Sequence, residues 1–391
     1  MDEKIKILVF VDYYLPGYKS GGPIRSIFNI VERLGDEFIF KIITRAHDYG
    51  DLTPYPHIEV DSWQPCGKAE VIYLSPEKIT FKNLRLIILD TEHDIAYLNS
   101  FFSPAFTFKP LLLRLINLIP QKPFIVAPRG EFSRGALSIK RFKKKIYLYC
   151  TKLIGLYNKV FWHATSIYEE ADIRQSFNPH ITIITANDMP APIHIRRGYR
   201  KMHEKKVGFL KIAFLSRIAR MKNLDSALRI LKNIKGNIQF NIYGIKEDDD
   251  YWKECESIIR KLPENIRVEY HGCVEHDNVA SVFEQHDILF LPSMGENFGH
   301  VILEAMLAGC PVLISDKTPW RDLEAKHVGW DLPLDEPERF REILQLLIDM
   351  DKSSFETWTK TAYEYGFMIS RSEDIEMQTR NMFALVKTNR I

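Results

Sequence analysis

Two glutamates are the residues whose type and spacing suggest chemistry most directly. Glu296 lies in the loop after the apolar stretch 288–291, and Glu304 lies eight residues later, inside a helical pattern. Eight helical residues span at most about 12 Å, so one extended, polyhydroxylated ligand can contact both carboxylates. The start of that helix also offers free N–H groups and a positive dipole to a phosphate. The alternative involves no ligand: one glutamate complements the helix dipole and the other is solvated.

Cations follow a second apolar stretch, at residues 212–216. Arg217 and Lys222 come directly after it, before a helical pattern begins at Leu224. Two cations at a strand end can neutralise a diphosphate leaving group without a metal. A charged surface loop with Asn223 as a helix cap is the alternative.

Paired glycines mark a third strand end. Gly21 and Gly22 precede Pro23, which opens a helical pattern. Glycines before a helix let the backbone approach a ligand closely, although such glycines also simply make turns.

The elements that must position these residues alternate along the chain. Apolar strands and amphipathic helices follow one another up to residue 185 and again from 212 to 315, which predicts parallel βαβ units. Residues 187–207 break the pattern with prolines and charges. We therefore predict an α/β protein of two tandem Rossmann-like domains that face each other across a cleft. The predicted parts are residues 1–190, a linker at 191–207, residues 208–371, and a last helix at 372–391 that packs back on the first domain.

Together these residues resemble the family 4 retaining glycosyltransferases of the GT-B fold, of the type that builds bacterial surface polysaccharides. Residues 271–315 look like the signature of that family, with Glu296 and Glu304 as its E-x7-E motif. The resemblance also covers Arg217, Lys222 and the Gly21–Gly22 loop, and more loosely residues 127–132 and 163–166.

The resemblance implies a role for each residue. Glu296 would contact the donor hexose near the reacting centre, and Glu304 would hold the ribose hydroxyls. Arg217 and Lys222 would bind the diphosphate and stabilise it as it leaves. The remaining contacts would come from Gly22, Asn297, Phe298 and Gly299 to the sugar and phosphates, and from Gly272 and Cys273 to the base. The implied reaction moves a hexose from a UDP- or GDP-sugar to a saccharide acceptor with retention of configuration, without a metal or another cofactor.

One departure from the family concerns the first domain. Many members carry a histidine near the transferred sugar where this chain has Arg129-Gly130-Glu131. Arg129 and Glu131 are candidate substrate contacts, and Glu131 is also a candidate general base. An ordinary surface ion pair between Arg129 and Glu131 is the favoured alternative. His163, at another strand end, is a candidate substrate contact or a packed histidine without a catalytic role. The sequence therefore assigns no general base.

The formal net charge of +2 conceals an uneven distribution. The chain carries 30 basic and 21 acidic residues up to Lys206, and 23 and 30 from Val207 onward, which gives charges of +9 and −7. Between Arg129 and Lys145 there are seven cations and one acidic residue, followed by apolar residues, as in a basic amphipathic surface helix. This pattern favours peripheral binding to anionic lipid and a lipid-linked acceptor. A solvated helix with a buried apolar side is the alternative.

Other classes of protein are disfavoured. The five cysteines are widely spaced without metal-site patterns, and the acidic N-terminus is unlike a signal peptide, so a cytoplasmic protein is expected. The chain has no G-x-G-x-x-G or P-loop motif, and its total charge gives no reason to expect a nucleic acid partner. Asp248-Asp249-Asp250 resembles a metal-binding motif, but it opens a helix, where acidic residues complement the dipole.

Two competing functions stay open. A nucleotide-sugar epimerase of the same fold needs an acid–base pair and no acceptor groove, and the basic stretch argues against it. A catalytically inactive sugar-binding scaffold has no need to keep Glu296, Glu304, Arg217 and Lys222 together.

Overall fold

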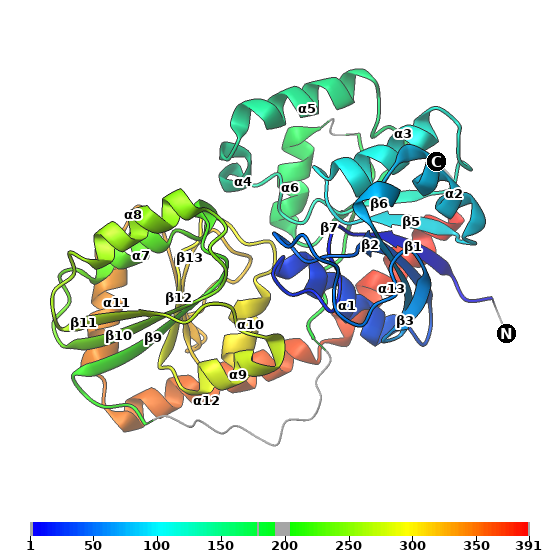
Figure 1. Cartoon of the computed structure of the whole chain (residues 1–391). Helices are drawn as coiled ribbons and strands as arrows, with labels where there is room; N and C mark the ends of the chain where they lie inside the picture. The colour runs from blue at the N-terminus through cyan, green and yellow to red at the C-terminus, as the bar shows by residue number, and fades with distance from the viewer. Residues whose placement is uncertain (1–2, 178–179, 192–203, 390–391) are drawn as a thin grey trace. The chain divides into compact units, whose positions relative to one another are not determined.

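The computed structural model describes residues 3–177, 180–191 and 204–389, and the chain divides into two compact units. The first unit comprises Met1–Pro192 and Ser372–Ile391, and the second comprises Ile193–Arg371. Each unit has its own sheet with helices packed against it (Figure 1). Residues 192–203, which make up most of the expected linker, lie outside the described residues.

The first unit is built on an eight-stranded sheet with the order β3-β4-β2-β1-β5-β6-β7-β8. Neighbouring strands are parallel except β3, which runs antiparallel to β4. The sequence does not predict β3, because its four residues include a proline and show no clear alternation. The strands are β1 (Lys6–Phe10), β2 (Ile39–Arg45), β3 (Trp63–Cys66), β4 (Ala69–Leu74), β5 (Ile95–Leu98), β6 (Phe124–Val126), β7 (Phe161–Ala164) and β8 (Ile183–Thr185).

Helices cover both faces of this sheet. Successive strand residues point to opposite faces, so Ile7 and Val9 pack in the core that includes α1 and α13, while Leu8 packs in the core beside α2, α3 and α6. The C-terminal α13 contacts α1 and β5. The helices are α1 (Gly22–Leu34), α2 (Phe81–Asp90), α3 (Lys109–Leu115), α4 (Arg134–Ser138), α5 (Arg141–Leu153), α6 (Ile167–Ser176) and α13 (Glu373–Thr388).

The second unit has a six-stranded parallel sheet with the order β11-β10-β9-β12-β13-β14 around one large core. Its strands are β9 (Phe209–Leu215), β10 (Asn237–Tyr243), β11 (Ile266–Tyr270), β12 (Ile288–Leu291), β13 (Val312–Ser315) and β14 (Gly329–Leu332). Its helices are α7 (Leu224–Leu231), α8 (Asp249–Ile259), α9 (His276–Glu284), α10 (His300–Leu307), α11 (Pro337–Asp349) and α12 (Lys352–Ser370). Two Rossmann-like sheets confirm the predicted fold class.

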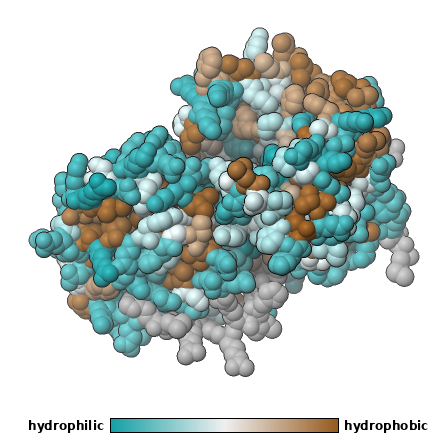
Figure 2. All heavy atoms as spheres, in the orientation of Figure 1, coloured by the Kyte–Doolittle hydropathy of each residue, from teal (hydrophilic) through white to brown (hydrophobic). Residues whose placement is uncertain are grey.

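One predicted helix begins later than expected. The sequence predicts a helix over residues 139–153, but Lys140 adopts a left-handed backbone with φ of 52°, so the helix, α5, begins at Arg141, after the separate short helix α4. Apolar residues also reach the surface nearby: in Figure 2 hydrophobic residues gather at the top of the view, over α3 and α5. Within the described part of the chain, no helix has the length and apolar character needed to cross a bilayer.

Candidate active site

The predicted donor-site residues of the second unit meet at one edge of its sheet. The loops after β9, β10, β11 and β12 carry Arg217, Gly244, Gly272 and Glu296, respectively. Because these strands are parallel neighbours, all four loops leave the same carboxyl edge, where open α/β sheets bind ligands.

Lys222 and Glu296 form a bidentate ion pair at this edge. The Lys222 ammonium donates to both carboxylate oxygens of Glu296, at 2.7 and 2.9 Å, and the two side chains are 15% and 9% exposed. The sequence separation of 74 residues is bridged by the adjacent strands β9 and β12. Both residues are predicted from the sequence to belong to one site, and the structure brings them into direct contact.

Backbone contacts hold the two loops of this pair together. Met294 N–H donates to the Met221 carbonyl at 2.8 Å, and the Asn223 side-chain amide donates to the Pro292 carbonyl at 3.0 Å. Asn223 is the N-cap residue of α7, as the alternative expected, but its side chain makes no capping hydrogen bond to the helix. The Glu296 N–H donates to the Lys317 carbonyl at 3.0 Å, which ties the loop to the end of β13.

The start of α10 lies directly after Glu296. Asn297 and Phe298 lead into Gly299, whose φ of 76° is a left-handed conformation that favours glycine, and α10 begins at His300. Gly299 has no side chain to cap the first N–H groups of α10, so the helix start is suited to an anion.

Glu304 lies inside α10 with its side chain 22% exposed. One carboxylate oxygen lies 3.7 Å from Nδ1 of His276, the first residue of α9. His276 is not predictable as a site residue from the sequence, because a histidine at a helix start belongs to no motif by itself.

Arg217 points toward a different carboxylate. Its Nη1 donates to Glu247 at 2.7 Å, and the side chain is 37% exposed. The two loops run together because Ile218 and Lys246 form an isolated parallel bridge. Sequence reasoning missed Glu247, since only the pairing of β9 with β10 brings it beside Arg217.

Glycines allow these loops to approach closely. Gly244 has φ of 133°, and a Cβ atom there would lie 1.9 Å from the Ser216 carbonyl oxygen. Its N–H donates to the Gly272 carbonyl at 2.7 Å. Gly272 has φ of 75°, and Cys273 beside it is exposed. Four loops of the second unit therefore converge with backbone groups and ionic side chains, as a site for a phosphorylated, hydroxyl-rich ligand requires.

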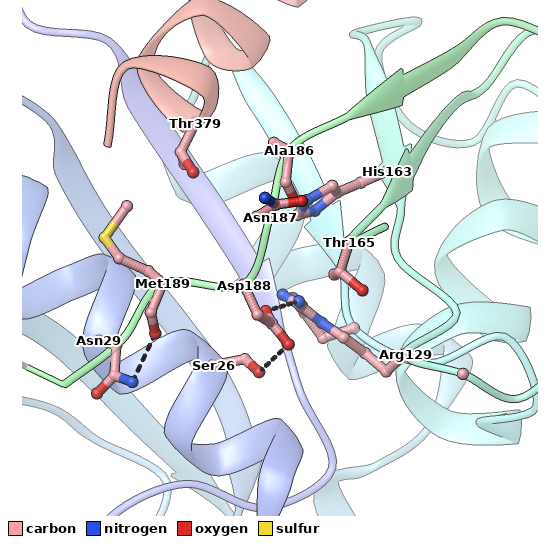
Figure 3. Close-up of polar contacts among 12 residues, drawn as sticks. Ser26, Asn29, Arg129, His163, Thr165, Ala186, Asn187, Asp188, Met189 and Thr379 are labelled. Atoms are coloured by element: carbon pink, nitrogen blue, oxygen red, sulfur yellow. Dashed lines mark hydrogen bonds and ion pairs between the residues drawn. The ribbon is translucent and has the colours of Figure 1, made fainter. Parts of the chain in front are cut away.

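In the first unit, Arg129 makes a buried ion pair with Asp188, drawn in Figure 3. The two side chains are 4% and 3% exposed. Arg129 also donates to Asn99 Oδ1, at 2.9 and 3.2 Å, and to the Tyr97 hydroxyl at 2.7 Å. The expected surface pair between Arg129 and Glu131 is therefore wrong: the Arg129 guanidinium is buried and pairs with the Asp188 carboxylate instead.

His163 lies at the end of the same hydrogen-bonded chain. Nε2 lies 2.8 Å from the Ala186 carbonyl, which can only accept, so Nε2 carries the proton and Nδ1 accepts from the Tyr97 hydroxyl at 2.7 Å. Burial, and secondarily the Arg129 charge, lowers the pKa of His163 to about 4. With 1% exposure and both ring nitrogens engaged, His163 has the geometry of the packed histidine rather than of a substrate contact.

Glu131 binds the loop at residues 100–102 instead of pairing with Arg129. Its carboxylate accepts from Ser100 Oγ at 2.9 Å and from the N–H groups of Phe101 and Phe102 at 2.5 and 3.2 Å. Burial raises the pKa of Glu131 to about 7, although these three hydrogen bonds favour the charged form. Glu169, which the sequence analysis missed, accepts from Gly130 N–H at 2.6 Å.

The Gly21–Gly22 loop opens α1. Gly21 has φ of 72°, and an added Cβ at either glycine meets no described atom within 4 Å. One helical turn further on, Ser26 Oγ donates to Asp188 at 3.0 Å, and Asn29 donates to the Met189 carbonyl at 2.7 Å (Figure 3). Asp188 therefore joins α1 to the buried Arg129.

The acidic run at residues 248–250 has the structural role that the sequence favours. Asp248 is the N-cap of α8 and accepts from Tyr251 N–H at 2.9 Å, with Asp249 and Asp250 in the first turn. Among the described residues, no group of three or more His, Cys, Asp or Glu side chains is arranged to hold a metal ion.

Comparisons with known proteins bear on the family and the fold of the chain. Residues 196–365 match the family model described as glycosyl transferases group 1. An uncharacterized 41.2 kDa protein in the cps region of Klebsiella pneumoniae is 26% identical over 280 residues, which cover 66% of this chain and 74% of that protein.

Two solved structures share the fold over nearly the whole chain. Sucrose-phosphate synthase from Thermosynechococcus elongatus has a TM-score of 0.72 and 17% identity, with 98% of this chain and 100% of that chain covered. Anabaena Alr3699/HepE, solved in complex with UDP-glucose, has a TM-score of 0.67 and 16% identity, with the same coverage.

The two Rossmann-like units and the family match define a glycosyltransferase of the GT-B fold. The second unit matches the glycosyl transferases group 1 family model over residues 196–365. This match confirms the resemblance to glycosyltransferases that Glu296, Glu304 and their surroundings indicated.

Proposed function

We propose that this glycosyltransferase transfers a hexose from a nucleoside diphosphate sugar to a saccharide acceptor with retention of anomeric configuration. The observation that carries the proposal is the Lys222–Glu296 pair beside the start of α10. It puts a cation, a carboxylate and helix N–H groups within one loop cluster, which fits a sugar attached to a diphosphate. A UDP-sugar is the first donor to test, because a neighbour in fold was solved with UDP-glucose; GDP-sugars are the second.

Each group has a proposed task in the reaction. The bond from the anomeric carbon to the diphosphate breaks, and the diphosphate keeps the electron pair. The acceptor oxygen bonds to that carbon on the same face, and its proton passes to the departing diphosphate. Lys222 and Arg217 stabilise the growing negative charge, and Glu296 orients the hexose through its hydroxyls. Because two cations serve the diphosphate, the proposal requires no metal or other cofactor.

The acceptor is proposed to be a lipid-linked saccharide of surface-polysaccharide assembly, held by the first unit. Two observations support this: the first half of the chain has a charge of +9 up to Lys206, and the Klebsiella relative is encoded in a cps region. A peripheral position at the inner face of the cytoplasmic membrane is part of the same proposal.

A donor screen with the purified full chain tests the function. Nucleoside diphosphate release is followed for UDP- and GDP-hexoses, with and without lipid-linked saccharides, and again after addition of EDTA. Release that depends on the acceptor, gives a product of unchanged anomeric configuration and persists in EDTA is expected. Epimerised donor would instead identify the epimerase, and a folded sample that turns over no donor would identify the scaffold.

A further inference from the structure

Helix α5 has one face attached to the first unit. The Tyr147 hydroxyl lies 3.0 Å from the Tyr157 hydroxyl and donates to the Phe101 carbonyl at 3.3 Å. Leu148 packs against the core, and Thr151 is buried. Thr151 follows Leu148 by three residues and Tyr147 by four, so these positions define the inward side of the helix.

The opposite side of α5 is apolar and exposed. Phe142, Ile146, Tyr149 and Leu153 are 76%, 47%, 69% and 73% exposed. At about 100° per residue these four positions fall within about 60° of one another, directly opposite Thr151. We call these four residues the α5 stripe. The sequence suggested a basic helix with its apolar side buried as the alternative; the structure shows apolar residues on both sides.

Cations flank the α5 stripe. Lys143 lies on one side of it, and Arg141 and Lys145 lie on the other, all three exposed. Within the described part of the chain, none of the three forms an ion pair with an acidic residue. Figure 2 shows that the hydrophobic surface over this region is continuous with residues over α3.

We propose that the α5 stripe docks into an anionic phospholipid surface, with the helix lying in the plane of the interface. The inference rests on the proposed function for its choice of a membrane that carries the acceptor. A helix of 13 residues is about 20 Å long, which suits an in-plane position. Apolar residues enter the boundary between headgroups and acyl chains, while Arg141, Lys143 and Lys145 contact lipid phosphates.

Charge distinguishes this occupant from a second copy of the chain. A symmetric dimer through the α5 stripe would bring the flanking cations of both copies together, and like charges repel. An anionic bilayer supplies the complementary charge on both flanks.

Flotation with lipid vesicles tests the proposal. The full chain is mixed with vesicles of phosphatidylcholine containing phosphatidylglycerol, and with phosphatidylcholine alone. Binding to the anionic vesicles is expected, with a decrease as salt rises. The variant Phe142→Ser with Leu153→Ser should lose about tenfold or more in vesicle partitioning. The matched control is Leu52→Ser with Met377→Ser, two exposed apolar residues elsewhere on the first unit, and it should bind like the parent chain.

Each other outcome overturns the proposal. Absence of binding to anionic vesicles would do so, as would equal binding by the stripe variant and the control. Concentration-dependent dimers that the stripe variant abolishes, without vesicle binding, would assign the surface to a second copy. Donor turnover with a soluble saccharide is measured in the same preparations without vesicles, so failure of docking and failure of the proposed activity are read separately.

Discussion

The Lys222 ammonium contacts both oxygens of the Glu296 carboxylate, across loops that follow two adjacent parallel strands. If Lys222 stabilises the leaving diphosphate, Lys222→Met should reduce kcat by about 10²–10³, the usual cost of losing one preorganised electrostatic contact. Glu296→Gln should reduce it comparably. Nucleoside diphosphate release measures both variants.

The matched control for this pair is Lys253→Met. Lys253 forms an exposed ion pair with Asp250 in the same unit and lies on α8, so its removal should leave turnover unchanged. Normal turnover in Lys222→Met would show that the site lies elsewhere.

Arg217 is expected to act on the donor, although its side chain is paired with Glu247. Arg217→Ala should lower kcat/KM for the donor by about 10- to 100-fold, because a diphosphate contact is lost. Arg220→Ala is the control, since Arg220 follows in the same loop but pairs with Glu254 on α8. Equal effects of the two changes would indicate a general loss of positive charge rather than a specific contact.

Much of the fold is predictable from the sequence, because buried parallel strands are short apolar runs and the spacing of apolar residues predicts the helices. The two sheets follow that rule. The exceptions are β3, with a proline in four residues, and β14, whose Gly329 and Asp331 interrupt the apolar pattern. The left-handed conformation of Lys140 was not predictable either, because a positive φ is uncommon for a residue other than glycine and a lysine gives no signal for it.

The site is predictable where residues belong to a loop motif, as with Lys222 and Glu296. It is not predictable where partners come from distant segments. Asp188 lies 59 residues from Arg129, and the residues that neighbour Asp188 in the sequence do not predict an ion pair. Only the order of strands in the sheet brings the ends of β6 and β8 close together.

The buried pair of Arg129 and Asp188 should matter for stability. Asp188→Ala leaves a buried guanidinium without its carboxylate, and the expected loss is about 3–5 kcal/mol in the free energy of unfolding. Asp36→Ala, which removes an exposed pair with Lys68, should cost less than about 1 kcal/mol. Urea-induced unfolding measures both. Similar small losses would show that Arg129 finds another partner or reaches water.

The pKa of Glu131 predicts a pH dependence. The carboxyl pKa rises from 4.5 to about 7 in the folded chain because of burial. Between those values the folded state binds more protons than the unfolded chain, so ionisation of Glu131 lowers the free energy of unfolding as pH rises. The stability of the parent chain relative to Glu131→Gln should therefore decrease from pH 4.5 to pH 7. The titration of His163 contributes equally to the stability of both proteins, so it cancels in this comparison. Parallel stability profiles would contradict the raised pKa.

Substitution of Gly22 tests whether the Gly21–Gly22 loop contacts a ligand or only serves the fold. An added Cβ at Gly22 meets no described atom within 4 Å, and its backbone lacks the positive φ of Gly21. The free energy of unfolding of Gly22→Ala should therefore equal that of the parent chain or exceed it by up to about 1 kcal/mol. Gly21 has a φ of 72°, so Gly21→Ala should lower the free energy of unfolding by about 1 kcal/mol. If donor phosphates approach this loop, Gly22→Ala should still raise KM for the donor by about tenfold, because its methyl group occupies the ligand's space. Unchanged donor kinetics in Gly22→Ala would mean that the two glycines only make the turn into α1.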